Sequence, residues 1–334
     1  LAATPSKIVI GTGENSGITL DQNTPYLISK SSSATNTLPN GNTGYMYFDT
    51  STGVLELHKY NDQGISWTGG IYASSGDLTI KLFETNYIKS TNNGIYVSGN
   101  LTIEGTGSLE LTKATNTTIY ASGDITIQGG AKVTATGGQD GQAIHAVGGT
   151  VTIKGSGTEV TATKGSGSAI RTGGDTNPGT IQLSDGACLK ADGIVTRKNG
   201  FFINGVATDF SDNKDITAQP VYTISGKVID ASTKKPVEGA LVQLCTADNV
   251  NANALTLIKE SNTDSSGEYK FSGISAGTYT IKVSKTGYNT ATKENVTVND
   301  STPNVSVQTI ALSPEIQTYT VKITGTEHMS LSSD

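Results

Sequence analysis

NGIYVSGNLTIEGTGSLELT (93–112) is the stretch that decides the fold of this chain. Apolar and polar residues alternate over Ile95–Val97, a Ser-Gly-Asn turn follows, and the alternation resumes through Leu101–Ile103 and again in 108–112. Alternation with period two, interrupted by glycine, predicts short β-strands joined by turns. The stretch therefore predicts three short strands and leaves no room for a helix.

Versions of this stretch recur along the first two thirds of the chain, as in GGIYASSGDLTI (69–80), TTIYASGDITI (117–127) and QAIHAVGGTVTI (142–153). A third short strand is expected at 108–112, 131–135, 159–163 and 188–192. One such unit cannot bury its apolar face alone, so neighbouring units must stack. We expect a right-handed parallel β-helix with about 24–26 residues per coil. The apolar residues that lead successive coils are Met46, Ile71, Ile95, Ile119, Ile144, Ile170 and Ile194.

The pattern divides the chain into five segments. We expect an N-terminal cap and first irregular coil at 1–45, the parallel β-helix at 46–205 and a polar linker at 206–220. A β-sandwich follows at 221–313, where alternating strands are separated by turns. Residues 314–334 are expected to begin a further domain or to be a truncated tail. The chain opens with LAATPSK, which is no signal peptide, so we expect a mature or truncated piece of a longer protein.

The second module carries a specific resemblance. ISGKVIDASTKKPVEGALVQL (224–244) and TDSSGEYKFSGISAGTYTIKVSKTGYNT (263–290) resemble the carboxypeptidase regulatory-like domain, which implies a transthyretin-like or Ig-like β-sandwich. The module is also similar to collagen-adhesin B-type repeats, some of which carry a Lys–Asn isopeptide bond assisted by an acid. Ser284 stands where that acid is expected, so Lys227 is interpreted as a solvated strand residue. The solenoid resembles, more loosely, the β-helix domains of bacterial surface and carbohydrate-binding proteins.

Composition excludes several classes of partner. The net charge is −6 and no basic stripe is present, so we expect no nucleic-acid partner. No apolar run approaches about 18 residues, so we expect no membrane insertion in this segment. Low charge with abundant Gly, Thr, Ser and Asn suits a secreted or cell-surface bacterial protein, and an extracellular location is predicted.

The middle residue of each Ile-x-Ala strand points outward. Stacked coils would bring these residues into one column, whose rings would repeat about every 4.8 Å. Such a column stabilises a solenoid by stacking alone. The alternatives are a binding face for a polysaccharide or a host or cell-surface glycan, and then one for a protein ligand. A second column, rich in threonine, is expected beside it. The candidate ligand-binding residues are Tyr47, Tyr72, Tyr96, Tyr120, His145 and Arg171. The second column is Glu56, Thr79, Thr102, Thr126, Thr152, Gln182 and Phe202.

No catalytic constellation is evident. Asp77 and Asp124 occupy equivalent positions two coils apart, about 10 Å from each other, which is too long for a glycosidase pair and fits turn-starting residues. We predict no catalytic residue, no metal site and no cofactor. The favoured function is a non-catalytic adhesin-like surface protein that binds glycans on its aromatic face. The alternatives are an accessory carbohydrate-binding region of a larger carbohydrate-active enzyme, or a β-helix polysaccharide lyase or hydrolase.

Overall fold

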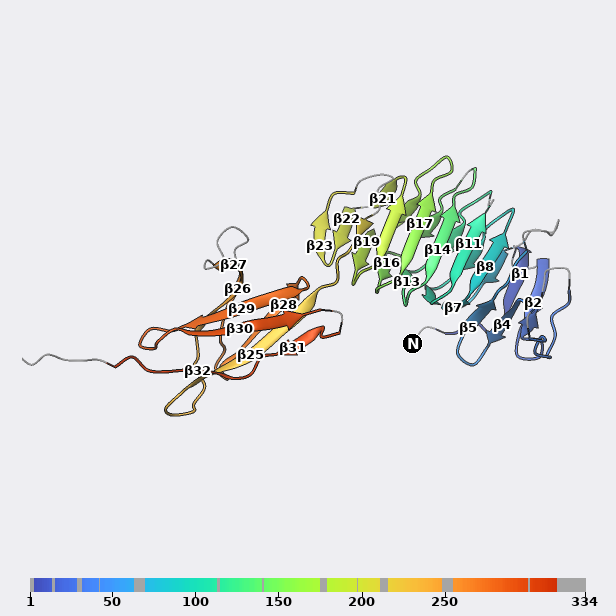
Figure 1. The fold of residues 1–334 in the computed structure, drawn as a ribbon. Coiled ribbons are helices and arrows are strands. Elements are labelled where there is room, and N and C mark those ends of the chain that lie inside the picture. Colours follow the sequence, from blue (N-terminus) through green and yellow to red (C-terminus); the bar gives the residue numbers. More distant parts are fainter. Residues whose placement is uncertain are drawn as a thin grey trace, which may run out of the picture. The chain divides into compact units, whose positions relative to one another are not determined.

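The computed structural model describes residues 3–13, 16–28, 32–41, 43–62, 70–112, 115–139, 141–174, 179–196, 198–210, 216–247, 255–299 and 301–316. All regular elements in these ranges are strands, and none of them is a helix suited to span a membrane. The chain divides into two compact units, Leu1–Pro220 and Val221–Asp334 (Figure 1). The predicted all-β class is confirmed.

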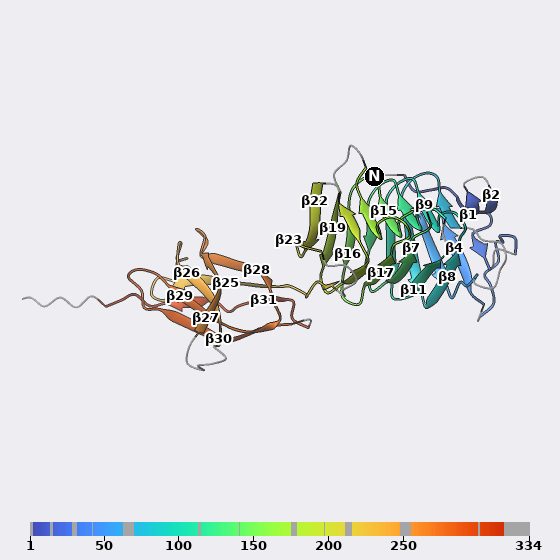
Figure 2. The same ribbon diagram turned by 90° about the horizontal axis from the view of Figure 1, so that it is seen from above.

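The first unit is a β-solenoid of three sheets, whose strands stack rung upon rung (Figure 2). Five consecutive coils, from β6–β8 to β18–β20, each contribute one strand to every sheet. Sheet A contains β1 (Ile8–Gly13), β2 (Ser16–Leu20), β6 (Gly70–Ala73), β9 (Ile95–Val97), β12 (Ile119–Ala121), β15 (Ile144–Ala146), β18 (Ile170–Thr172) and β21 (Ile194–Thr196). Sheet B contains β3 (Tyr26–Leu27), β4 (Tyr45–Asp49), β5 (Val54–His58), β7 (Leu78–Phe83), β10 (Leu101–Gly105), β13 (Ile125–Ile127), β16 (Val151–Lys154), β19 (Gly179–Ser184), β22 (Lys198–Ile203) and β23 (Val206–Thr208). Sheet C contains β8 (Thr85–Lys89), β11 (Ser108–Thr112), β14 (Lys132–Thr136), β17 (Glu159–Thr163), β20 (Cys188–Ala191) and β24 (Ile216–Thr217).

Parallel pairing in strict register builds the solenoid core. In sheet A, Ile119 pairs with Ile95 on one side and with Ile144 on the other. Sheets B and C repeat this arrangement, with Ile103 beside Ile127 and Leu109 beside Val133. One inward position of sheet C is polar: Asn86 lies beside Leu109, and its amide donates to the carbonyl oxygens of Phe83 and Ser108. Burial of these columns removes apolar surface from water along the whole axis. The inward isoleucines of sheet A are fully buried: Ile71, Ile95, Ile119, Ile144 and Ile170.

The N-terminal end of the solenoid is antiparallel, which corrects the predicted columns. Met46 and Tyr47 lie in β4, which forms a hairpin with β5 in sheet B instead of a first rung in sheet A. The rung beside β6 is occupied by β1, antiparallel to it, with Ile10 opposite Ile71. An antiparallel hairpin shows the same period-two alternation as a solenoid coil, so the pattern could not separate them. The tight turn over Asp49–Gly53 closes the hairpin: the Asp49 carboxylate accepts the backbone N–H of Ser51 at 2.9 Å.

Register also corrects the start of the second column. Thr79, Thr102, Thr126 and Thr152 are consecutive neighbours in sheet B, as predicted. The residue that pairs with Thr79 from β5 is Val54, whereas Glu56 pairs with Lys81. The pairing of β5 with β7 therefore differs by two residues from the predicted one. Because side chains alternate with period two, this shift leaves Glu56 outward and Leu55 and Leu57 buried.

Hydrogen bonds between successive coils also run along the corner between sheets A and B. The Asp77 carboxylate accepts the backbone N–H of Asn100 at 2.7 Å, and the side-chain amide of Asn100 at 3.2 Å. Asn100 Oδ1 in turn accepts the N–H of Asp124 at 2.8 Å, and Asp124 accepts the N–H of Thr150 at 2.7 Å. Each side chain thus satisfies a backbone donor of the next coil. Asp77 and Asp124 therefore act as turn residues that link coils.

The second unit is a sandwich of two sheets, one of mixed pairing and one antiparallel. One contains β25 (Tyr222–Asp230), β28 (Glu268–Ile274), β31 (Asn304–Ser306) and β32 (Ile310–Leu312). The other contains β26 (Leu241–Ala247), β27 (Leu255–Asn262), β29 (Gly277–Ser284) and β30 (Ala291–Val298). The sequence analysis missed β27, an edge strand that is exposed along almost its whole length. An edge strand that buries neither face lacks the one-sided alternation used to find strands.

We predict that Ile119→Ala lowers the free energy of unfolding of the solenoid by about 2–5 kcal/mol, because it empties a fully buried position between two isoleucines. Thr126→Ala, on the outward and half-buried column of the next strand, should cost much less. Urea unfolding of both variants, followed by circular dichroism, measures the difference. Equal losses for the two variants would contradict the inward–outward assignment.

Candidate functional site

The predicted column of outward residues exists from Tyr72 onward. Tyr72 pairs with Tyr96, Tyr96 with Tyr120, and Tyr120 with His145 in sheet A. Arg171 follows His145 in the next coil. The structure thus brings five of the six candidate residues together on consecutive strands. We refer to these five residues, Tyr72, Tyr96, Tyr120, His145 and Arg171, as the sheet A column.

The rings of the sheet A column stack on one another. The centroids of Tyr96 and Tyr120 lie 5.1 Å apart with their planes at 1°, and Tyr72 lies 6.0 Å from Tyr96 at 28°. Since 5.1 Å exceeds the ~3.5–4 Å contact distance between carbons, the parallel rings of Tyr96 and Tyr120 are offset. An offset stack leaves part of a ring face uncovered. His145 closes the stack, edge-to-face against Tyr120 at 5.7 Å.

The tyrosines differ in accessibility. Tyr72 is only 4% exposed and its hydroxyl points toward the carbonyl oxygen of Asn93 at 3.5 Å, whereas Tyr96 and Tyr120 are half-buried. Burial raises the pKa of the Tyr72 hydroxyl. Tyr72 therefore supports the stack, and the accessible aromatic surface belongs to Tyr96 and Tyr120.

A shallow groove of about 280 Å³ lies against these two rings. Its other walls are amides and a hydroxyl from the corner that precedes each sheet A strand. Asn93 is held by its Nδ2, which donates to the carbonyl oxygen of Thr117 at 2.7 Å. Asn116 Nδ2 donates to Asn92 Oδ1, so the amides of successive coils form a ladder of their own. The groove residues are Asn93, Tyr96, Asn116, Thr117 and Tyr120.

The amide and hydroxyl walls were missed by the sequence analysis, which placed a threonine column beside the tyrosines. Thr79, Thr102 and Thr126 lie in sheet B, whereas the tyrosines lie in sheet A. The signal for the true neighbours was present as TNNG (91–94) and TNTT (115–118), just before the Ile-Tyr pairs. Asn and Thr at a corner are typical of turns, so their side chains were not assigned to a binding face.

Tyr47 belongs to a different aromatic cluster at the N-terminal end of sheet B. Its ring centroid lies 4.8 Å from that of Tyr26, which in turn meets Tyr45 edge-to-face at 6.1 Å. His58 stacks between Tyr45 at 4.5 Å and Phe83 at 4.3 Å. The Nε2 of His58 lies 3.0 Å from Glu56 Oε2, so this cluster also holds a carboxylate. These rings lie on the strands that close the end of the solenoid.

His145 and Arg171 form the polar end of the sheet A column. The Nε2 of His145 and the Nε of Arg171 are buried, and neither atom has a hydrogen-bond partner within the described part of the chain. Burial, followed by the positive charge of Arg171, lowers the pKa of His145 to about 4. The imidazole is therefore neutral at pH 7. The sequence RTGGDTNPG (171–179) predicts a corner in which Arg171 and Asp175 form an ion pair, and Asp175 lies outside the described residues.

Known proteins indicate the family of this chain. The profile of the carboxypeptidase regulatory-like domain matches residues 223–313, which confirms that resemblance. A second profile, described as carbohydrate-binding domain-containing protein, matches residues 73–267, more than half of the chain. The chain belongs to this carbohydrate-binding family. The match begins in β6 and takes in Tyr96, Tyr120 and every other residue of the groove.

Solved structures match only part of the chain. A type II cohesin–X-dockerin complex from Acetivibrio cellulolyticus is 27% identical over 27% of this chain and 56% of that chain, with a TM-score of 0.21. The major pilin subunit BcpA of Bacillus cereus is 21% identical over 30% of this chain and 32% of that chain, with a TM-score of 0.22. The C-terminal domain of a shaft pilin from Lactobacillus rhamnosus GG is 18% identical over 29% of this chain and all of that domain, with a TM-score of 0.21. No curated protein matches the chain.

Acidic side chains in the turns of the first unit accept hydrogen bonds from the backbone. Asp49 accepts the N–H and hydroxyl of Ser51, and Asp62 Oδ1 accepts the N–H of Lys89 at 2.8 Å. Among the described residues, no three His, Cys, Asp or Glu side chains gather as a metal site would require. The groove itself is lined by amides, hydroxyls and rings, with no carboxylate or imidazole among its lining residues.

We predict that acid weakens the solenoid through His145. Its folded pKa of about 4 lies below the ordinary value of 6.5, so the unfolded chain binds the extra proton first and stability falls as the pH drops from 6.5 toward 4. The slope contributed by this residue is at most about 1.4 kcal/mol per pH unit. His145→Gln should flatten the decline of the melting temperature between pH 7 and pH 5. Parallel declines in the native chain and the variant would contradict the assignment.

Proposed function

We propose that this chain is a non-catalytic, extracellular carbohydrate-binding protein of the adhesin type, and that the groove beside Tyr96 and Tyr120 receives the saccharide. The family match to carbohydrate-binding proteins supports the class of ligand. The observation that carries the proposal is the groove itself, in which two offset tyrosine rings meet a wall of amides and a hydroxyl.

Each wall of the groove suits one part of a sugar. The apolar C–H face of a pyranose packs on an aromatic ring, and Tyr96 and Tyr120 offer partly uncovered rings. Hydroxyl groups at the sugar's edge need partners that both donate and accept, which the amides of Asn93 and Asn116 provide. Because these side chains are already held by neighbouring coils, little conformational entropy is lost on binding.

The absence of a carboxylate in the groove supports binding without catalysis. Glycoside hydrolysis by the usual route needs two carboxylates that flank the scissile bond. The groove residues supply none, and Asp77 and Asp124 hold backbone N–H groups of the next coil.

We infer that the solenoid, proposed at 46–205 with its cap at 1–45, presents the ligand surface. The predicted linker at 206–220 holds β23 and β24, which pair with β22 and β20, so this segment is the end of the solenoid. The sandwich at 221–313 would act as a spacer.

We predict that the double variant Tyr96→Ala/Tyr120→Ala loses at least about tenfold in affinity for its saccharide, because the central aromatic groups of a binding site carry much of its binding energy. The measurement is binding of the native chain and the variant to a panel of immobilised polysaccharides and glycans. Tyr87→Ala is the matched control, since Tyr87 is a half-buried outward tyrosine on sheet C. Circular dichroism checks that all variants keep the β spectrum.

Two results would contradict the proposal. One is binding by the native chain that the double variant retains in full, which would leave the tyrosines as structural stacking alone. The other is a native chain that binds nothing on the panel, which would leave a protein ligand or a stalk role for the column. A further variant, Tyr96→Phe/Tyr120→Phe, keeps the stacked rings and should keep most of the affinity.

A further inference from the structure

The outward face of sheet B carries an aromatic cluster that is separate from the solenoid groove. Its rings contact one another across four neighbouring strands, β3, β4, β5 and β7. Tyr45, His58 and Phe83 are stacked face to face, and the rings of Tyr26 and Tyr47 extend this stack toward the end of the sheet. We refer to these five residues, Tyr26, Tyr45, Tyr47, His58 and Phe83, as the sheet B cluster.

The sheet B cluster is not needed to close the end of the solenoid. The alternate residues of the same strands point inward and are at most 1% exposed, namely Leu27, Met46, Phe48, Leu55, Leu57 and Leu82. The rings of the cluster are half-buried, and within the described part of the chain none of them belongs to the hydrophobic core of the solenoid. They are therefore covered chiefly by one another. Aromatic surface that gathers outside a core is typical of binding surfaces, because it is costly to leave in water.

Tyr47 lies where the rings of this cluster give way to charged groups. It pairs with Tyr26 on one neighbouring strand and with Glu56 on the other. The ring of Tyr26 is tilted by 30° from that of Tyr47 at a centroid distance of 4.8 Å, so the two rings diverge and do not cover each other completely. On the other side the neighbour of Tyr47 is a carboxylate side chain. The Tyr47 ring therefore offers surface on which the C–H face of a pyranose can pack.

Glu56 and Lys81 continue the same outward column. They are cross-strand neighbours on β5 and β7, and the side chain of Glu56 is 29% exposed. Glu56 Oε2 lies 3.0 Å from His58 Nε2, and a carboxylate with about four lone-pair sites can accept further hydrogen bonds. The ammonium group of Lys81, 5.3 Å from the centroid of Phe83, supplies donors. Because the two charges are opposite, the pair suits the hydroxyl groups of a neutral sugar better than it suits an ion.

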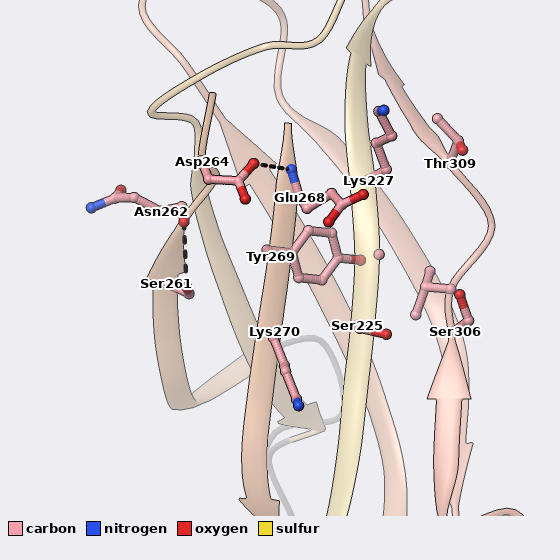
Figure 3. A pocket seen from close by; sticks show the side chains of 12 residues that line it. Ser225, Lys227, Ser261, Asn262, Asp264, Glu268, Tyr269, Lys270, Ser306 and Thr309 are labelled. Carbon is pink, nitrogen blue, oxygen red and sulfur yellow. Dashed lines mark hydrogen bonds between the residues drawn. The ribbon is translucent and has the colours of Figure 1, made fainter. Parts of the chain in front are cut away.

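The groove of about 550 Å³ on the sandwich does not offer this combination (Figure 3). Its charged side chains include Glu268 and Lys270, which are exposed on β28, and Lys227 on β25. Tyr269 alternates with Glu268 and Lys270 and packs in the sandwich core over Gly226, where it is 4% exposed. Its hydroxyl has no hydrogen-bond partner among the described residues. The ring and the charged groups thus face opposite ways there, whereas on sheet B they share one face.

We propose that the sheet B cluster, with Glu56 and Lys81, is a second saccharide-binding site. The C–H face of a neutral pyranose packs on Tyr47 and Tyr26, and its hydroxyl groups bond to the carboxylate of Glu56 and the ammonium group of Lys81. The site lies on a different sheet from the solenoid groove and shares no lining residue with it. The carbohydrate-binding family match begins at Ala73, after Tyr47 and Glu56, so the class of ligand is inferred from the side chains of the site itself.

The test uses the full chain with the solenoid groove removed by Tyr96→Ala/Tyr120→Ala. Titrations followed by saturation-transfer NMR measure binding of the methyl glycosides of glucose, galactose, mannose and N-acetylglucosamine to this parent. Tyr47→Ala and, separately, Glu56→Gln should each weaken the bound glycoside about tenfold or more, because they remove the ring surface and the charged acceptor. Tyr47→Phe keeps the ring and should keep most of the affinity.

Controls on sheet C separate the site from general effects of substitution. Tyr87→Ala and Glu110→Gln change half-buried outward residues of β8 and β11, and both variants should bind as the parent does. Thermal unfolding without sugar separates binding from folding. Glu56→Gln should barely change the melting temperature, because it keeps the size of a partly exposed side chain whose ion pair contributes little.

The proposal is overturned if none of the four glycosides binds the parent, or if either Tyr47→Ala or Glu56→Gln binds as tightly as the parent. These outcomes leave the solenoid groove untested, because that groove is absent from the parent. If the parent binds the polysaccharide panel as the native chain does while Tyr47→Ala reduces glycoside binding, the solenoid proposal fails and this one stands.

Discussion

The register between successive coils is the constraint on which the rest of the solenoid depends. Parallel rungs lie about 4.8 Å apart, so each inward side chain must fit against its equivalent in the next coil. The structure absorbs irregular lengths at corners to keep this register. The sequence has six residues between β18 and β19 and four between β15 and β16, yet Ile181 still pairs with Val151. Buried apolar columns thus hold the period, and the corners tolerate the variation.

The register that aligns the inward side chains also aligns the outward ones. When inward isoleucines repeat, outward residues at the same strand position must form columns as well. Backbone donors at the corners are satisfied by Asp77, Asn100 and Asp124, each serving the next coil. The tyrosine stack and the amide ladder beside it are two further columns of this kind. The solenoid groove therefore arises from the same repetition that builds the core, and its side chains are held in place before any ligand arrives.

The sandwich has no such repeat. Its strands pair with partners that are distant in sequence, so each residue has different neighbours. Gly226 leaves room for Tyr269, and the break between β31 and β32 opens the sheet at the same place. Two features that would each weaken a sandwich thus coincide around one unsatisfied hydroxyl.

The sequence by itself determined the all-β class, the repeating coils and the column from Tyr72 to Arg171, because period-two alternation and a 24–26-residue repeat translate directly into strands and rungs. Only the tertiary structure decided that Tyr47 leaves this column for the β4–β5 hairpin, since a hairpin and a coil share one alternation. It also decided that Tyr72 is buried, that Asn93 and Asn116 wall the groove, and that Tyr269 lacks a partner. These outcomes depend on which residues from distant coils and strands share a neighbourhood, and a local pattern carries no information about that.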